Sequence, residues 1–175
     1  IAPNIAPFIY AGGKSRIADE VWRRFGNPVN FIEPFCGSAA VLLARPACAA
    51  PPVETVGDAD GFIANTWRAI RAAPDETARW ADYPVSHVDL TARHRWLKGK
   101  RESLTAQLLA DPDWYDAKIA GWWLWGCALW IGDGWCAGGA VRRTHPEVPY
   151  VGEMQVAAVE CLHRHDRGHR IRIPF

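Results

Sequence analysis

Apolar and polar residues follow one another along the first 72 residues in the pattern of a mixed α/β segment. Apolar positions four residues apart predict a helix over 15–25 whose buried face carries Ile17, Val21 and Phe25. The next elements are predicted to be, in order, a strand over 29–32, a helix over 38–44, a strand over 53–56 and a helix over 62–72. This order predicts a parallel βαβ unit at the start of an α/β sheet.

From about Pro74 the pattern becomes helical, polar at first and heavily aromatic later. Helices are predicted over 75–81, 89–110, 114–131 and 153–163, with a Gly-rich loop at 131–139 and a strand-like RIRIPF at 170–175. Trp122 and Trp125 share a helical face with Ile119, an arrangement that usually packs against neighbouring elements. These tryptophans are therefore predicted to be mostly core residues.

Composition narrows the class of protein. A chain of 175 residues corresponds to about one domain, and its net charge of +1 gives no global attraction to polyanions, so any nucleic-acid surface must be local. The five cysteines are odd in number and lack a CxxC pair, which predicts reduced thiols of a cytoplasmic protein. The longest uncharged run, 119–132, is too short to span a bilayer, so no membrane association is expected.

The candidate ligand-binding residues lie near the ends of the two predicted strands. Parallel sheets bind ligands beyond the carboxyl ends of their strands. Glu33 ends the first strand, and Gly37 and Ser38 form a turn whose backbone N–H groups are expected to face a ligand. Asp58 follows the second strand at the position of an acid that holds ribose hydroxyls, and Lys14 lies in a Gly-Gly turn.

The same residues argue against a dinucleotide site. The sequence has neither GxGxxG nor GxxxxGK[ST], and the carboxylate of Glu33 would repel a pyrophosphate, so a nucleotide-dependent oxidoreductase is a weaker alternative. An ammonium, a carboxylate and a ribose suit Glu33, Lys14 and Asp58 better, and S-adenosylmethionine carries all three. Asp60 competes with Asp58 for the ribose, or instead caps the next helix. Cys36 is interpreted as a small packed residue.

Three segments resemble one enzyme family. YAGGK (10–14), FIEPFCGSAAV (31–41) and GDADGFIANTWRAI (57–70) resemble, in order and spacing, the opening motifs of adenine-specific DNA methyltransferases of the D12, or Dam-like, class. The resemblance implies a Rossmann-like core with a helical target-recognition insertion, S-adenosylmethionine as methyl donor, double-stranded DNA as partner and no metal. It implies donor-binding roles for Tyr10, Lys14, Glu33, Pro34, Phe35, Gly37 and Asp58.

The resemblance also implies a division of the chain. Residues 1–73 would form the donor-binding part of the core, 74–150 the DNA-recognition insertion, and 151–175 a return toward the core. The candidate DNA-binding residues are Trp135, in its Gly-rich loop, and Arg142 and Arg143 behind it. His163, His165 and His169 have spacing that can look metal-like, but their arginine-rich surroundings predict a cationic tail.

One motif of the family is missing. No DPPY-type motif, which receives the flipped adenine, is found, and DPDW at 111–114 lacks the second proline and comes too early. Asp111 and Pro112 are predicted to end one helix, and Asp113 to cap the next. Because the chain also begins without methionine, it is expected to be a fragment that binds the donor without transferring the methyl group. The alternative is a catalytically inactive S-adenosylmethionine- or DNA-binding module. The DNA site, the oligomeric state and a restriction-linked, phage or solitary role stay open.

Overall fold

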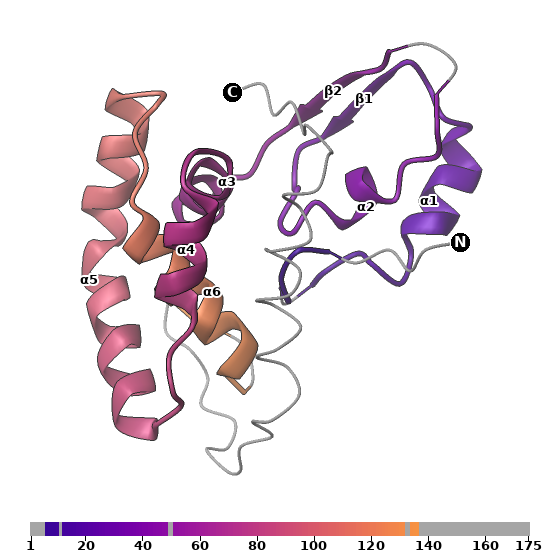
Figure 1. Cartoon of the computed structure of the whole chain (residues 1–175). Coiled ribbons are helices and arrows are strands. Elements are labelled where there is room, and N and C mark those ends of the chain that lie inside the picture. Colours follow the sequence, from indigo (N-terminus) through magenta and orange to yellow (C-terminus); the bar gives the residue numbers. More distant parts are fainter. Residues whose placement is uncertain (1–5, 11, 49–50, 132–133, 137–175) are drawn as a thin grey trace.

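A computed structural model describes residues 6–10, 12–48, 51–131 and 134–136. Its strands are β1 (Asn30–Glu33) and β2 (Val53–Val56), which pair in parallel from Asn30 opposite Val53 to Glu33 opposite Val56. The short helix α2 (Ala40–Leu43) lies in the connection between them, and α1 (Ala18–Phe25) precedes them (Figure 1). The predicted βαβ unit is therefore present. A larger Rossmann-like core stays a prediction, because the described residues contain only these two strands.

Helix α1 packs through a different face from the one that its spacing predicted. Ala18 and Trp22 are buried, whereas Ile17 and Phe25 are 52% and 60% exposed. The Trp22 ring lies 4.5 Å from that of Phe31 in β1, between ring centroids, and its Nε1 donates a hydrogen bond of 2.7 Å to the Val41 carbonyl. The large indole thus sets the orientation of the helix. The predicted buried face was wrong for Ile17 and Phe25, whereas Val21 is partly buried and packs against the cluster of Trp22.

The described residues cover one face of the sheet formed by β1 and β2. Phe31 and Glu33 point to the buried face, while Ile32 and Val53 on the opposite face are 62% and 59% exposed. Parallel sheets usually bury both faces. Within the described ranges, no element covers the face that carries Ile32 and Val53.

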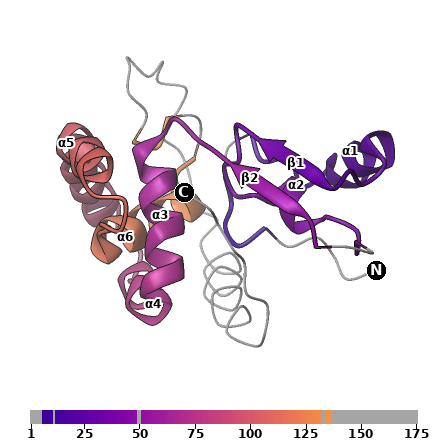
Figure 2. The same ribbon diagram turned by 90° about the horizontal axis from the view of Figure 1, so that it is seen from above.

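Four helices form a separate group beside the sheet: α3 (Gly61–Ala72), α4 (Pro74–Ala81), α5 (His87–Ala110) and α6 (Ala117–Leu129). Seen from above, they lie on one side of β1 and β2, with α1 on the other (Figure 2). Their starts carry local caps: the side chains of Asp60, Ser86 and Asp116 accept hydrogen bonds from backbone N–H groups of the first turns of α3, α5 and α6.

The loop between α5 and α6 contains DPDW. Asp111 ends α5, and its side chain accepts a 2.9 Å hydrogen bond from the Asp113 N–H, so this aspartate shapes a surface turn. The cap of α6 is Asp116 and not Asp113, which corrects the predicted start of that helix. The start of α6 is fixed to α3, because the fully buried Asn65 donates to the Asp116 carbonyl and accepts from its N–H, at 2.9 and 2.8 Å.

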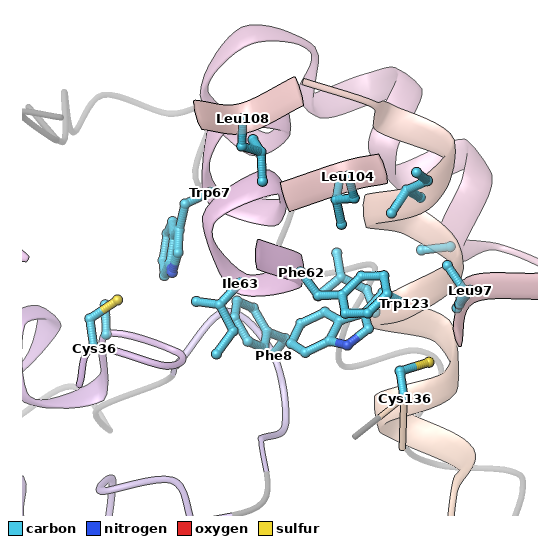
Figure 3. Close-up of a cluster of buried hydrophobic side chains, with 14 residues drawn as sticks. Phe8, Cys36, Phe62, Ile63, Trp67, Leu97, Leu104, Leu108, Trp123 and Cys136 are labelled. Atoms are coloured by element: carbon cyan, nitrogen blue, oxygen red, sulfur yellow. The ribbon is translucent and has the colours of Figure 1, made fainter. Parts of the chain in front are cut away.

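The larger of two apolar clusters in the described residues joins the helices to the turn after β1 (Figure 3). The rings of Phe62 and Trp123 are stacked with an angle of 5° between their planes, and Phe8 packs edge-on against Trp123. Trp67 of α3 and Cys36 of the turn belong to the same cluster, as do Leu97, Leu104 and Leu108 of α5. The core therefore extends across residue 73. None of the helices in the described part has the length and apolar character that crossing a bilayer requires.

Candidate functional site

The turns that follow β1 and β2 are held together by main-chain hydrogen bonds. The Gly57 N–H donates to the Glu33 carbonyl at 2.9 Å, and the Cys36 N–H donates to the Gly57 carbonyl at 3.0 Å. These bonds continue the parallel pairing past the last strand residues. The turns at 34–38 and 57–60 consequently lie side by side at the carboxyl edge of the sheet, where a parallel sheet presents its ligand site.

Asp58 is the link between the two turns. Its Oδ2 accepts a 3.0 Å hydrogen bond from the Gly37 N–H, and its Oδ1 accepts one of 3.0 Å from the Asp60 N–H. The expectation that the Gly37 N–H would face a ligand is corrected here, because that donor is used by Asp58. An ionised carboxylate accepts about four hydrogen bonds, so each oxygen of this half-buried residue keeps one acceptor position.

Gly37 lies where the turn after β1 packs against the ring of Tyr10. Its φ of +50° lies in the left-handed region, and a Cβ built on it would come within 2.9 Å of Tyr10 Cδ1. Its carbonyl accepts a 2.8 Å hydrogen bond from Trp67 Nε1 of α3. A residue larger than glycine does not fit here. Three of the residues that sequence analysis proposed, Tyr10, Gly37 and Asp58, are thus brought together.

Lys14 and Glu33 form an ion pair beside these turns, with 3.1 Å between Lys14 Nζ and Glu33 Oε1. Glu33 is only 5% exposed; its Oε2 accepts a hydrogen bond from the Leu42 N–H, while Oε1 is held by the ion pair. Burial raises the pKa of Glu33, and the neighbouring Lys14 opposes that rise. The ammonium of Lys14 also donates to the Phe35 carbonyl, so this pair fixes the EPF turn from the inside.

The remaining two residues of that turn point outward. Phe35 is 75% exposed, and Pro34 is exposed as well. The structure therefore separates the predicted donor-binding residues into two kinds. Glu33 and Lys14 build the turn, whereas the Phe35 ring is exposed at the sheet edge and the half-buried Asp58 accepts one backbone hydrogen bond on each oxygen.

Asp60 has a partner that sequence reasoning did not identify. It caps α3 by accepting from the Phe62 N–H, and its Oδ1 lies 3.1 Å from Arg101 Nη1 of α5. The guanidinium of Arg101 also covers the Phe62 ring, 4.9 Å from its centroid. The cap follows from the sequence, since Asp60 precedes a helix, but no local signal points to a residue 41 positions away. Asp60 is thus neutralised, and Asp58 has no cation within 4 Å among the described residues.

Cys36 lies within the turn but is buried. Burial raises the pKa of its thiol to about 12, with further upward contributions from Asp58 and Glu33. The thiol is therefore protonated at neutral pH and does not serve as a nucleophile. In the described ranges, no three His, Cys, Asp or Glu side chains lie close enough together to hold a metal ion.

Of the candidate DNA-binding residues, the structure describes Trp135 alone. Its Nε1 donates a 3.0 Å hydrogen bond to the Trp123 carbonyl, and its ring packs directly on Gly126 and beside His94. This half-buried packing was not predicted, and DNA contact by Trp135 stays a prediction. The candidates Arg142 and Arg143 and the three C-terminal histidines lie outside the described residues.

Comparison of the chain with protein-family models, curated proteins and solved structures finds no match.

Proposed function

We propose that the sheet edge formed by residues 34–38 and 57–60 binds S-adenosylmethionine, and that the chain is the donor-binding part of an adenine-specific DNA methyltransferase. In the proposed reaction the adenine N6 attacks the sulfonium methyl group, the carbon–sulfur bond breaks, and N6 loses a proton. S-adenosylhomocysteine is the product. Because the sulfonium is already an activated leaving group, the protein mainly aligns donor and amine.

The observation that carries the proposal is the arrangement around Asp58. Both of its oxygens are oriented by backbone N–H groups, and each has the capacity to accept a further hydrogen bond. Two adjacent acceptors on one fixed carboxylate match the two neighbouring hydroxyls of a ribose. The preorganisation is supplied by the fold, so a ligand need not order this side chain on binding.

The charges at the site support a cationic ligand. Lys14 is paired with Glu33, and Arg101 is paired with Asp60, whereas Asp58 has hydrogen bonds but no paired cation in the described part. The edge therefore keeps one uncompensated negative charge. A sulfonium and an ammonium are attracted to such a site, while a pyrophosphate is repelled.

The aromatic residues of the edge supply the surface for an adenine. The Phe35 ring is three-quarters exposed next to the Asp58 turn, and the half-buried Tyr10 ring lies against Gly37. Aromatic faces stack on purines and provide apolar area with little loss of side-chain freedom. In this proposal Phe35 contacts the base or the thioether part of the donor, and Tyr10 holds the turn.

The test is a calorimetric titration with S-adenosylhomocysteine and with its 2′,3′-dideoxy analogue. The native chain should prefer the ribose form by about 30-fold, corresponding to about 2 kcal/mol for hydrogen bonds to a charged acceptor. In Asp58→Ala that preference should vanish. Comparing two ligands separates a ribose contact from general damage to the turn, which would weaken both ligands alike.

Asp19→Ala is the matched control, because it removes the same group from an exposed position on α1. It should leave both affinities unchanged. An Asp58→Ala protein that still prefers the ribose form would refute the role of Asp58. Failure of the folded native chain to bind S-adenosylhomocysteine would refute the donor site itself.

The absent DPPY-type motif favours a second candidate function, a donor- or DNA-binding module without transferase activity. The two are separated by incubating the native chain with tritiated S-adenosylmethionine and duplex DNA. Radioactivity in N6-methyladenine establishes transfer. Donor binding without incorporation into DNA supports the binding module.

A further inference from the structure

The middle of α5 carries a concentration of positive charge. Residues 93–101, RHRWLKGKR, contain five of the 20 lysines and arginines of the chain and no acidic residue. The whole chain has a net charge of only +1, so this segment differs strongly from the average. Basic runs of this length are typical of nucleic-acid contacts, and also of ordinary solvated helix faces. The surroundings of each cation decide between these interpretations.

Two of the five cations are used inside the protein. Arg93 is nine-tenths buried, with its guanidinium 4.2 Å from the centroid of the Tyr83 ring and 4.3 Å from that of Trp125. Arg101 is paired with Asp60 at the end of the donor site. Both have structural partners and are not available to a ligand.

The other three cations, Arg95, Lys98 and Lys100, are exposed. None of them forms an ion pair within the part of the chain that the structure describes. Lys100 lies over the Trp96 ring, with Nζ 5.4 Å from the ring centroid. Trp96 and Lys100 are four residues apart and therefore share one side of α5.

Helix α6 adds a further cation to that side. Lys118 Nζ lies 4.5 Å from the centroid of the Trp122 ring and 5.2 Å from that of Trp96. The two indoles contact each other, with ring centroids 5.0 Å apart. Lysines from two helices are thus held over one pair of half-buried tryptophans. We call Trp96, Lys100, Lys118 and Trp122 the cation–tryptophan surface; the exposed Arg95 directly precedes Trp96 on α5.

We propose that the cation–tryptophan surface binds the phosphate backbone of duplex DNA. Lys100 and Lys118 of this surface, together with the neighbouring Arg95 on α5, present positive charge that no described carboxylate pairs with, which is the complement of a polyanion. The indoles support the lysine side chains through cation–π contacts. Because the ammonium groups cover the ring faces, the tryptophans do not present free faces for base stacking, and the contact is with phosphates.

Acidic residues border this surface without occupying it. Glu76 of α4 interacts with the nearby Trp80, whose Nε1 lies 3.5 Å from Glu76 Oε1, and Glu102 follows the basic segment on α5. The positive area is consequently limited to a few phosphates. Such contacts position a protein on DNA and add no sequence preference of their own. Identifying the polyanion as DNA rests on the proposed function.

The test is the salt dependence of binding to a short fluorescein-labelled DNA duplex, followed by fluorescence anisotropy between about 50 and 200 mM KCl. The variant Arg95→Gln/Lys100→Gln/Lys118→Gln should lower the magnitude of the slope of log K against log salt by about 2 to 3, because each phosphate contact contributes about 0.9. Arg95→Gln/Lys100→Gln, which keeps Lys118 in its aromatic surroundings, should lower it by about 1 to 2.

The matched control is Arg16→Gln/Arg23→Gln/Arg24→Gln, which removes the same number of charges at and before α1. This control should bind like the native chain. Equal losses in the control and the test variant, an unchanged slope in the test variants, or tighter binding of an RNA duplex would each overturn the proposal. S-adenosylhomocysteine titrations of the same variants should match the native chain, so failure of the DNA surface and failure of the donor site are distinguishable.

Discussion

Replacing Gly37 by alanine tests how tightly the turn after β1 is built. The substitution adds one methyl group at a residue with a φ of +50°, 2.9 Å from Tyr10 Cδ1. The left-handed conformation costs a non-glycine residue about 1–2 kcal/mol. Pushing an aromatic ring out of a packed position costs about 1–3 kcal/mol more. We expect Gly37→Ala to lower the free energy of unfolding by about 2–5 kcal/mol.

Two other glycines allow these contributions to be separated. Gly26 has a φ of +67° but open space around a built Cβ, so Gly26→Ala should cost about 1 kcal/mol for conformation alone. Gly99 lies inside α5 with no atom within 4 Å of a built Cβ. Gly99→Ala should therefore stabilise the protein by about 0.5–1 kcal/mol, since alanine is the better helix former.

The assay is urea-induced unfolding followed by tryptophan fluorescence, with the three variants and the native chain measured at the same pH. The expected order of stability is Gly99→Ala, native, Gly26→Ala and Gly37→Ala. If Gly37→Ala were as stable as Gly26→Ala, the Tyr10 ring would have moved aside without lowering the free energy of unfolding. That result would refute the tight packing of this turn.

Two further predictions concern titration and reactivity. Burial raises the pKa of Glu33 above its ordinary 4.5, so the stability that this group contributes is present below about pH 4.5 and is lost as the pH rises through the raised pKa. The free energy of unfolding in urea, measured across about pH 4 to 7, should show this loss in the native chain and not in Glu33→Gln. The same pH dependence of stability in both proteins would contradict the prediction. Burial also raises the pKa of Cys36 and of Cys136 to about 12, so iodoacetamide at about pH 8 should label the less buried Cys48 and spare both. Peptide mapping by mass spectrometry measures this, and labelling of Cys36 as fast as Cys48 would speak against the buried thiol.

The helices were predictable where their start signals are local. The predicted start of α4 at 75 and of α5 at 89 lie within two residues of the observed Pro74 and His87. Proline in the first turn and the Ser86 cap are short-range features that the sequence displays directly. The start of α6 was placed too early, because Asp113 and Asp116 are equally plausible caps until the contact with Asn65 fixes one of them.

Which face a helix buries was harder to predict. In α1, Ile17 and Phe25 and the alternative pair Ala18 and Trp22 both have helical spacing, and the outcome depends on the size of the indole and its bond to Val41. In α6, buried residues surround the helix, so no single apolar stripe exists. The predicted core residue Trp125 is buried, as is Trp123, whereas Trp122 is only partly buried.

At the candidate site, the strand ends and the spacing between Gly37 and Asp58 were readable from the sequence because a βαβ unit fixes that geometry. Which partner each polar side chain binds could not be predicted from the sequence. Glu33 and Lys14 pair with each other, and Arg101 reaches Asp60 from another helix. These partners are decided by tertiary packing, which leaves no periodic trace in the sequence.

The double hydrogen bonding of Asp58 has an evolutionary consequence. The same carboxylate that we propose to bind a ribose also fastens the turn after β1 to the turn after β2. Selection for a folded protein alone is therefore enough to retain this aspartate, together with the glycine that it contacts. In a lineage that loses methyl transfer, the ribose-binding signature is expected to outlast the activity for as long as the two turns must stay joined.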